Sequence, residues 1–252
     1  MSRRSNVSKE RSPKVMFQFK RFAVRQDRTP MKVGTDGVLV GAWASVEAAD
    51  RRMLDIGTGT GLIALMLAQR TEGAASEVHI TGIDVEDVAQ ARENAAASPW
   101  GARLDFVQEP VQAYRSGERF DLIVSNPPFF VDSLTCPDPG RTTARHAVSL
   151  PFEELRDAAV RLLAPGGRFA VVLPTVEGER FAALCRGRLA LRRLTRVRTT
   201  PRRAAKRVLM EFVPAGACDG LPACDELTIG TGGHECYTEE YRALTRDFYL
   251  KF

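Results

Sequence analysis

Short apolar runs alternate with segments of helical periodicity from residue 51 onward. The apolar runs predict strands at 51–56, 77–84, 103–108, 120–126, 168–174, 189–198 and 207–213. The segments between them predict helices at 62–70, 87–97, 151–167 and 177–187. Strands and helices that alternate in this way predict an α/β fold with one doubly wound sheet and helices on both faces.

Two stretches lie outside this alternation. Residues 1–14 are polar and basic without periodicity, so we expect a flexible basic tail over 1–16 and a single domain over 17–252. The stretch 127–150 follows a nearly all-apolar strand and has no periodicity of its own. Irregular stretches of that length are uncommon in compact domains unless they are functional, which makes 127–150 a candidate for part of a site.

The charge of the 252-residue chain is unevenly distributed. Its 36 Lys and Arg and 31 Asp and Glu give a net charge of only +5. However, residues 1–35 hold ten basic and two acidic residues, and 181–210 hold ten basic and none acidic. Such asymmetry is expected of a protein that approaches a polyanion, although Arg-rich solvated faces would give the same count. The candidate phosphate contacts are Lys20, Arg21, Arg198, Arg202, Arg203, Lys206 and Arg207.

The cysteines and the N-terminus bear on the compartment. The five cysteines form no CxxC pair, and with only three histidines the chain offers no zinc-site spacing. We therefore expect reduced thiols, no metal and a cytoplasmic protein. No apolar run approaches the ~18 residues that span a bilayer, so we expect neither secretion nor membrane insertion.

A glycine loop, DIGTGTG at 55–61, follows the first predicted strand and precedes a helix. A dinucleotide fingerprint would need its third glycine at Leu62, so the spacing departs from that pattern. Asp55 with three alternating glycines instead resembles motif I of class I methyltransferases that use S-adenosylmethionine (SAM). The loop could also be a tight turn that binds nothing.

Asp84 ends the second predicted strand, 23 residues after Gly61. An acidic residue at this place reaches ribose hydroxyls in nucleotide-binding sheets. Asp55 fits the same ligand, because SAM carries an α-ammonium where a dinucleotide carries a pyrophosphate. The alternative for Asp84 is a solvated acid at the end of a strand.

The turn Asn126-Pro127-Pro128-Phe129 follows the strand at 120–126 and resembles motif IV of methyltransferases that act on planar amino groups. The lone pair of such an amine is delocalised, and accepting hydrogen bonds from both of its N–H groups helps to localise it. The Asn126 side-chain oxygen and the Pro127 carbonyl can accept these bonds, and Phe129 offers a ring for a base to stack on. A rigid structural turn is the alternative.

Four segments together extend the resemblance over nearly the whole chain. They are the stretch FQFKRFAVRQDRTPMKVGTDGVLVGAW (17–43), the glycine loop, NPPF, and YTEEYRALTRDFYLKF (237–252). With these segments the chain resembles the bacterial tRNA1(Val) (adenine-37-N6)-methyltransferase family. The resemblance implies a monomeric, Rossmann-like enzyme with a seven-stranded sheet, in which 17–50 closes over cofactor and substrate. It also implies SAM as cofactor and the adenosine just 3′ of a tRNA anticodon as target.

The same resemblance assigns residues. It implies a catalytic turn made of Asn126, Pro127, Pro128 and Phe129. It implies a cofactor site made of Thr35, Asp36, Asp55, Gly57, Gly59, Gly61, Asp84, Val85, Glu109 and Asn126. One departure concerns the acid that often meets the SAM adenine, because Pro110 stands at its aligned position and Glu109 comes one residue earlier. Either Glu109 takes that role, or backbone and packing hold the adenine.

Three other functions stay open at this point. A guanine-N2 rRNA methyltransferase and a protein-glutamine methyltransferase both act on planar amino groups with an NPP motif. The latter would not need the basic segments, and relatives of the former often carry a duplicated N-terminal domain. The third is a tRNA-binding module without catalysis, which the intact Asp55, glycines and Asn126 argue against.

Overall fold

The computed structural model describes residues 15–74, 76–128, 150–217 and 220–252. Most of the candidate stretch 127–150 and residues 1–14 of the predicted tail fall outside these ranges, as does Phe129 of the predicted catalytic turn. Across the ranges described, no helix combines the length and apolar character needed to cross a membrane.

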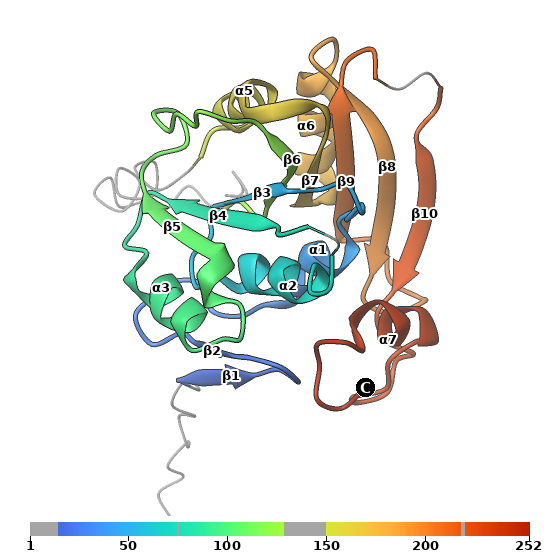
Figure 1. The fold of residues 1–252 in the computed structure, drawn as a ribbon. Helices are drawn as coiled ribbons and strands as arrows, with labels where there is room; N and C mark the ends of the chain where they lie inside the picture. The colour runs from blue at the N-terminus through green and yellow to red at the C-terminus, as the bar shows by residue number, and fades with distance from the viewer. Residues whose placement is uncertain (1–14, 75, 129–149, 218–219) are drawn as a thin grey trace, which may run out of the picture.

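A mixed eight-stranded sheet, in the order β10-β8-β9-β7-β6-β3-β4-β5, forms the centre of the fold (Figure 1). Its strands are β3 (Arg52–Ile56), β4 (His79–Asp84), β5 (Leu104–Gln108), β6 (Phe120–Ser125), β7 (Leu163–Pro174), β8 (Leu189–Arg198), β9 (Arg207–Pro214) and β10 (Ala223–Thr228). β9 pairs antiparallel with β7 and β8, and the other pairings in this sheet are parallel. The carboxyl ends of β3 to β8 therefore share one edge, which we call the carboxyl edge.

The α/β class with helices on both faces is confirmed, but the sheet and one of the predicted helices differ from the expectations. The sheet has the seven expected strands and an eighth, β10, added beside β8. The helix predicted over 151–167 is shorter, because α5 (Phe152–Leu162) ends before the Pro-Gly-Gly sequence and β7 already begins at Leu163. Pro165 explains this early end, since the residue before a proline is driven out of the helical conformation.

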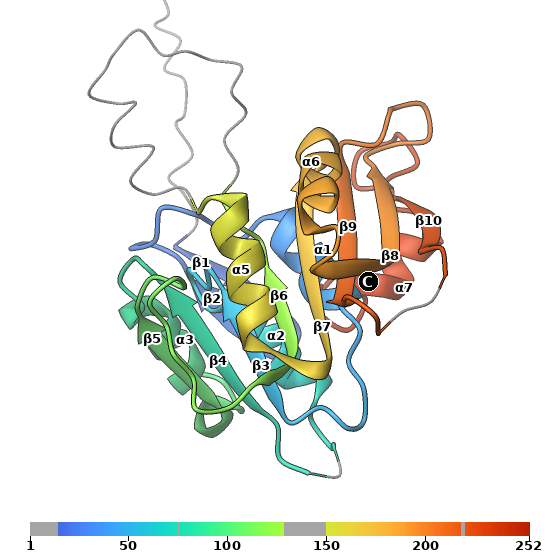
Figure 2. The same cartoon turned by 90° about the horizontal axis from the view of Figure 1, so that it is seen from above.

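Helices cover the two faces of the sheet in separate layers (Figure 2). One layer holds α1 (Thr35–Trp43), α2 (Leu62–Arg70) and α3 (Ala89–Ala96), and the other holds α5 and α6 (Thr175–Cys185). Successive strand residues alternate between the two hydrophobic cores, as with Met53 and Leu54. α1 is buried from Gly37 to Trp43, so the basic segment 17–43 ends in a core helix.

The beginning and the end of the described chain meet on the α1 side of the sheet (Figure 1). The hairpin of β1 (Met16–Gln18) and β2 (Ala23–Arg25) approaches the segment that follows α7 (Glu239–Thr245). Rings from both ends form a chain of contacts in which the centroids of neighbouring rings lie at most 6.3 Å apart. We call this group the terminal aromatic cluster: Phe17, Phe19, Phe22, Tyr249 and Phe252. Lys20 donates from its backbone N–H to the Phe248 carbonyl at 2.8 Å. The two segments that carry much of the family resemblance thus form one structural unit.

Candidate active site

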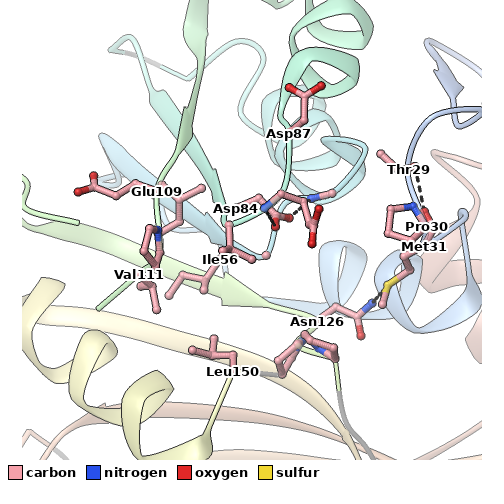
Figure 3. Close-up of a pocket in the computed structure, with 18 of the residues that line it drawn as sticks. Thr29, Pro30, Met31, Ile56, Asp84, Asp87, Glu109, Val111, Asn126 and Leu150 are labelled. Atoms are coloured by element: carbon pink, nitrogen blue, oxygen red, sulfur yellow. Dashed lines mark hydrogen bonds between the residues drawn. The ribbon is translucent and has the colours of Figure 1, made fainter. Parts of the chain in front are cut away.

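A cavity of about 250 Å³ opens where β3, β4, β5 and β6 reach the carboxyl edge (Figure 3). The first three of these strands contribute residues at or just after their carboxyl ends: Ile56, Gly57, Gly59, Asp84, Val85, Glu86, Asp87, Glu109, Pro110, Val111 and Gln112. Asn126, Pro127 and Pro128 come from the end of β6, and Arg28, Thr29, Pro30 and Met31 come from the loop before α1. The parallel sheet thus brings the predicted glycine loop, acidic strand end and NPP turn to one place.

The glycine loop presents open backbone to this cavity. Gly57 and Gly59 have φ values of 73° and 53°, and a Cβ added at either would meet nothing within 4 Å. Their backbone can therefore approach a ligand closely. Gly61, the third glycine assigned to the cofactor, instead caps α2, where an added Cβ would lie 3.3 Å from Ala91 Cβ. Gly61 thus serves close packing and does not line the cavity.

Asp84 fixes the loop and borders the cavity at once. Its Oδ2 accepts a hydrogen bond from the Gly59 N–H at 2.8 Å, and its Oδ1 accepts one from the Glu86 N–H at 3.0 Å. Val85 and Glu109 lie beside it in the lining, and the Glu109 N–H donates to the Asp84 carbonyl at 2.9 Å. With Glu86 and Asp87, this end of the cavity gathers four carboxyl groups, an arrangement that favours a ligand carrying positive charge.

Asp55 lies beneath the loop and does not line the cavity. It is fully buried, with Oδ2 accepting hydrogen bonds from Thr58 Oγ1 at 2.7 Å and the Ala64 N–H at 3.3 Å. Its Oδ1 has no hydrogen-bond partner within the described residues. Burial raises the pKa of Asp55 to about 7, since desolvation penalises the charged form more than its hydrogen bonds favour it.

The raised pKa gives Asp55 a defined effect on stability. In the folded state the proton is held up to about pH 7, whereas in the unfolded chain it leaves near the ordinary aspartate pKa of 3.8. Stability from this group is therefore present below about pH 4 and is lost as the pH rises towards 7. We expect Asp55→Asn to raise the free energy of unfolding at pH 8 by roughly 1–3 kcal/mol, measured by urea denaturation, and to change it little at pH 4. Parallel stability profiles of the two proteins from pH 4 to 8 would contradict this assignment.

The NPP turn stands at the end of the central strand β6. Ser125 Oγ donates to the Ile56 carbonyl at 2.9 Å, which ties β6 to the glycine loop. Asn126 is half-buried, and its Nδ2 lies 3.9 Å from the Met31 sulfur (Figure 3). A thioether accepts but does not donate, so this contact turns the Asn126 amide nitrogen towards Met31 and leaves Oδ1 for a ligand.

Sequence analysis named no residue of one wall of the cavity, although the resemblance implied that the segment 17–50 closes over cofactor and substrate. Arg28, Thr29, Pro30 and Met31 line it, together with Gln90 of α3, which holds their loop. Apart from that resemblance, the local signal was the turn-forming stretch Asp27 to Pro30 inside a basic segment, and nothing in this stretch indicates which residues reach the cavity.

Thr35 and Asp36, assigned to cofactor closure, begin α1 near the cavity without lining it. Asp36 forms an ion pair with Arg207, at 2.7 Å between Oδ2 and Nε. The next residue, Gly37, approaches the NPP turn, because a Cβ added there would lie 3.8 Å from Asn126 Nδ2. The pair thus joins the start of β9 to the helix end beside Asn126.

The predicted phosphate contacts fall into two groups. Four of them bind other parts of the protein: Lys20, Arg21, Arg198 and Arg207. The other three, Arg202, Arg203 and Lys206, are exposed in the loop between β8 and β9. This loop lies on the carboxyl edge, because Arg207 pairs with Pro174 at the end of β7, the strand next to β6. The structure therefore places an exposed basic loop on the same edge as Asn126.

The acidic residues of the cavity do not amount to a metal site. Throughout the described ranges, no group of three or more His, Cys, Asp or Glu side chains could hold a metal ion.

Comparisons with known proteins extend these observations. The methyltransferase small domain family matches residues 37–183. The chain is 46% identical over 239 residues to the tRNA1(Val) (adenine(37)-N6)-methyltransferase of Bacteroides thetaiotaomicron, covering 93% of this chain and 97% of that protein. It is 47% identical over 240 residues to the protein of the same name from Phocaeicola vulgatus, covering 94% and 99%.

Solved structures share the fold at much lower identity. A "predicted O-methyltransferase" from Agrobacterium tumefaciens aligns with a TM-score of 0.63 at 19% identity, over 84% of this chain and 96% of its own. The glycopeptide N-methyltransferase MtfA, solved in complex with SAM, aligns with a TM-score of 0.52 at 16% identity, over 73% and 90%. These two alignments show the fold alone.

Proposed function

The chain belongs to the methyltransferase small domain family and to the tRNA1(Val) (adenine(37)-N6)-methyltransferase family, and from this premise we propose that it transfers a methyl group from SAM to N6 of adenosine 37 in a valine tRNA. One observation carries the proposal. The Asn126–Pro128 turn, which suits a planar amine, lines the same cavity as the glycine loop and Asp84.

The residues present fit SAM. Gly57 and Gly59 offer open backbone for its methionine part, and Asp84 borders the place of its ribose. The carboxyl groups around Asp84 suit a cationic ligand. Glu109, Pro110 and Val111 together border the cavity beside Asp84, so carboxylate and apolar packing are both available to an adenine ring. When bound, SAM supplies an electrophilic methyl group on a sulfonium sulfur.

The protein's part in the reaction is to position the amine. The Asn126 Oδ1 accepts one N6–H and the Pro127 carbonyl accepts the other, which draws the nitrogen lone pair out of the adenine ring. The lone pair would then form the new N–C bond as the bond between the methyl group and the sulfonium sulfur breaks, with its electron pair left on the sulfur, and the methylated nitrogen would lose its extra proton to water. No strong general base is needed for this loss, so orientation and hydrogen bonding carry the catalysis.

An adenosine stacked in an anticodon loop cannot reach Asn126, so the target base must swing out of its stack into the cavity. Contacts between the protein and the RNA phosphates hold the anticodon loop while the base is extruded. The basic loop of Arg202, Arg203 and Lys206 lies on the same edge of the sheet and supplies cations for these contacts.

We expect Arg202→Ala/Arg203→Ala to weaken binding of unmodified tRNA roughly tenfold at about 0.1 M salt. The slope of log K against log salt concentration falls in magnitude by about 2, because each lost phosphate contact removes about one unit. Fluorescence anisotropy with labelled tRNA over a salt series measures both quantities.

A matched pair of arginines provides the control for this experiment. Arg186 and Arg188 are equally exposed but lie at the amino end of β8, on the opposite edge of the sheet. Arg186→Ala/Arg188→Ala should bind tRNA within about twofold of the parent. Equal losses in the two double variants would mean that only net charge matters and that the carboxyl edge is not the RNA surface.

The proposed function itself is tested by methyl transfer from labelled SAM to total unmodified tRNA, followed by nuclease digestion and nucleoside mass analysis. N6-methyladenosine at position 37 of a valine tRNA is the expected product. Methylguanosine would indicate guanine-N2 chemistry, and label in protein alone would indicate a glutamine substrate. Either of these results would overturn the proposed substrate.

A further inference from the structure

The loop between β2 and α1 forms a wall of the cavity that faces the NPP turn. Its residues Arg28 to Met31 all line the cavity, and Met31 reaches Asn126, with 3.9 Å between its sulfur and Nδ2 (Figure 3). Glu109 and Val111 lie at the other end of the cavity in the same view. Met31 therefore belongs to the end of the cavity that holds the acceptors for the target amine, away from the end that suits the adenosine part of SAM.

This wall is held from inside by a buried polar side chain. Gln90 of α3 is only 2% exposed, and its Oε1 accepts hydrogen bonds from the Arg28 and Thr29 N–H groups, both at 3.2 Å. Its Nε2 donates to Asp27 Oδ1 at 2.7 Å. All three bonds end on the loop, so the packing of α3 against the sheet fixes the loop backbone.

A second fastening closes the loop on itself. Lys32 Nζ donates to the Thr29 carbonyl at 2.8 Å, and the Val33 N–H donates to Gln26 Oε1 at 2.7 Å. Gln26 is itself buried. With partners on both of its sides, the loop is a preformed wall, and little ordering is required of it when a ligand enters.

Met31 is left half-uncovered by this otherwise well-fastened loop. Its side chain is 49% exposed, although the loop backbone around it is tightly bonded. An amine that donates to Asn126 Oδ1 is attached to a flat aromatic ring, and Met31 touches the other end of that same amide. Such a ring must pass next to the Met31 thioether, which is polarisable and makes favourable contacts with aromatic rings.

We infer that Met31 is a substrate-binding residue that packs against the target base, and that Gln90 is the positioning residue that holds it there. This inference rests on the proposed function, since the base is the one whose amine meets Asn126. The base that fits this site is an extruded purine with an exocyclic amine, and Met31 covers one side of it.

The test compares Met31→Ala with Met16→Ala, a matched control of the same residue type. Met16 is 47% exposed on β1 and does not line the cavity. Met31→Ala should raise KM for unmodified tRNA about tenfold and leave the Kd of SAM, measured by calorimetry, within about twofold. Met31→Leu, which keeps the apolar volume, should recover tRNA KM to within about threefold of the parent. Met16→Ala should match the parent in both quantities.

A binding signal independent of turnover completes the test. A tRNA anticodon stem-loop with 2-aminopurine at the target position gains fluorescence when the base leaves its stack, and quenching changes with what then covers it. Met31→Ala should alter this emission at saturating protein, whereas Met16→Ala should not. Gln90→Ala should give the same change and also speed amide exchange of Arg28 and Thr29 at least about tenfold.

The outcomes separate the two proposals. If the parent protein does not methylate tRNA adenosine, the proposed function fails irrespective of Met31. If the parent does so and Met31→Ala behaves like Met16→Ala in both KM and emission, the inference is wrong. It is equally wrong if Met31→Ala weakens SAM as much as tRNA, because Met31 would then touch the cofactor.

Discussion

Asn126→Ala is expected to lower kcat for methyl transfer by about a thousandfold while leaving SAM affinity within about twofold. The amide oxygen of Asn126 is one of two acceptors proposed for the target amine, and it stands at the end of a rigid central strand. Removing a fixed hydrogen-bonding group that acts on the reacting atoms costs about 10²–10³ in rate, and here the open space also lets the base shift. Rapid-quench single turnover with unmodified tRNA measures the chemical step, and calorimetry measures SAM binding.

Asn126→Asp is the informative companion to this variant. It keeps an oxygen acceptor of the same length but loses the Nδ2 contact with Met31 and adds a charge to a cavity already lined by Asp84 and Glu109. Its rate should fall between those of Asn126→Ala and the parent. If Asn126→Ala lost SAM binding in proportion to its rate, Asn126 would be part of the cofactor site and the proposed role would be refuted.

Asp50→Ala should destabilise the fold by about 3–5 kcal/mol, the cost of leaving a buried charge without its partner. Asp50 and Arg168 are 3% and 2% exposed, and Arg168 Nη2 lies 2.6 and 2.5 Å from the two Asp50 oxygens. The pair joins the segment between α1 and β3 to β7, so its loss loosens the attachment of this segment to the sheet. Urea unfolding followed by circular dichroism provides the measurement.

Two further variants identify the cause. Glu47 also contacts Arg168, at 3.3 Å, but its side chain is 48% exposed, so Glu47→Ala should cost at most about 1 kcal/mol. The double variant Asp50→Leu/Arg168→Met removes both buried charges and should recover much of the loss seen with Asp50→Ala. Similar destabilisation by Asp50→Ala and Glu47→Ala would show that burial adds nothing to this pair.

The central strands could be predicted because they are buried on both faces and therefore read as apolar runs. β10 could not, since ACDELT has mostly exposed side chains and pairs only with β8 at the edge of the sheet. α1 also lacked a signal, because a helix buried all round has no polar face to set a period. A strand buried on both faces is recognised as an apolar run, and a helix buried on one face is recognised by its helical period. β10 is mostly exposed and α1 is buried all round, so neither element shows such a pattern.

The site follows the same division. The glycine loop, Asp84, Glu109 and Asn126 could be placed together because each follows a strand, and parallel strands end at one edge. Met31 and Gln90 could not, because only the packing of α3 on the sheet brings them near that edge.

Counts of charged residues also failed to predict which cations are available to RNA. Arg207 meets an acid 171 residues earlier in the chain, and such pairing over long separations leaves no trace in local composition. A basic segment read from sequence therefore overstates the cations available to RNA.

The terminal aromatic cluster delays the completion of folding during protein synthesis. Lys20 Nζ donates to the carbonyls of Arg246 and Phe252, over separations of 226 and 232 residues. At about 5–20 residues per second, a translating ribosome needs roughly 10–50 s to supply the partners of the β1–β2 hairpin. Throughout that interval Phe17 and Phe19 lack their final neighbour Tyr249, so the hairpin cannot complete its packing. The β1–β2 hairpin, although it is synthesised first among the described elements, is thus among the last to reach its final packing.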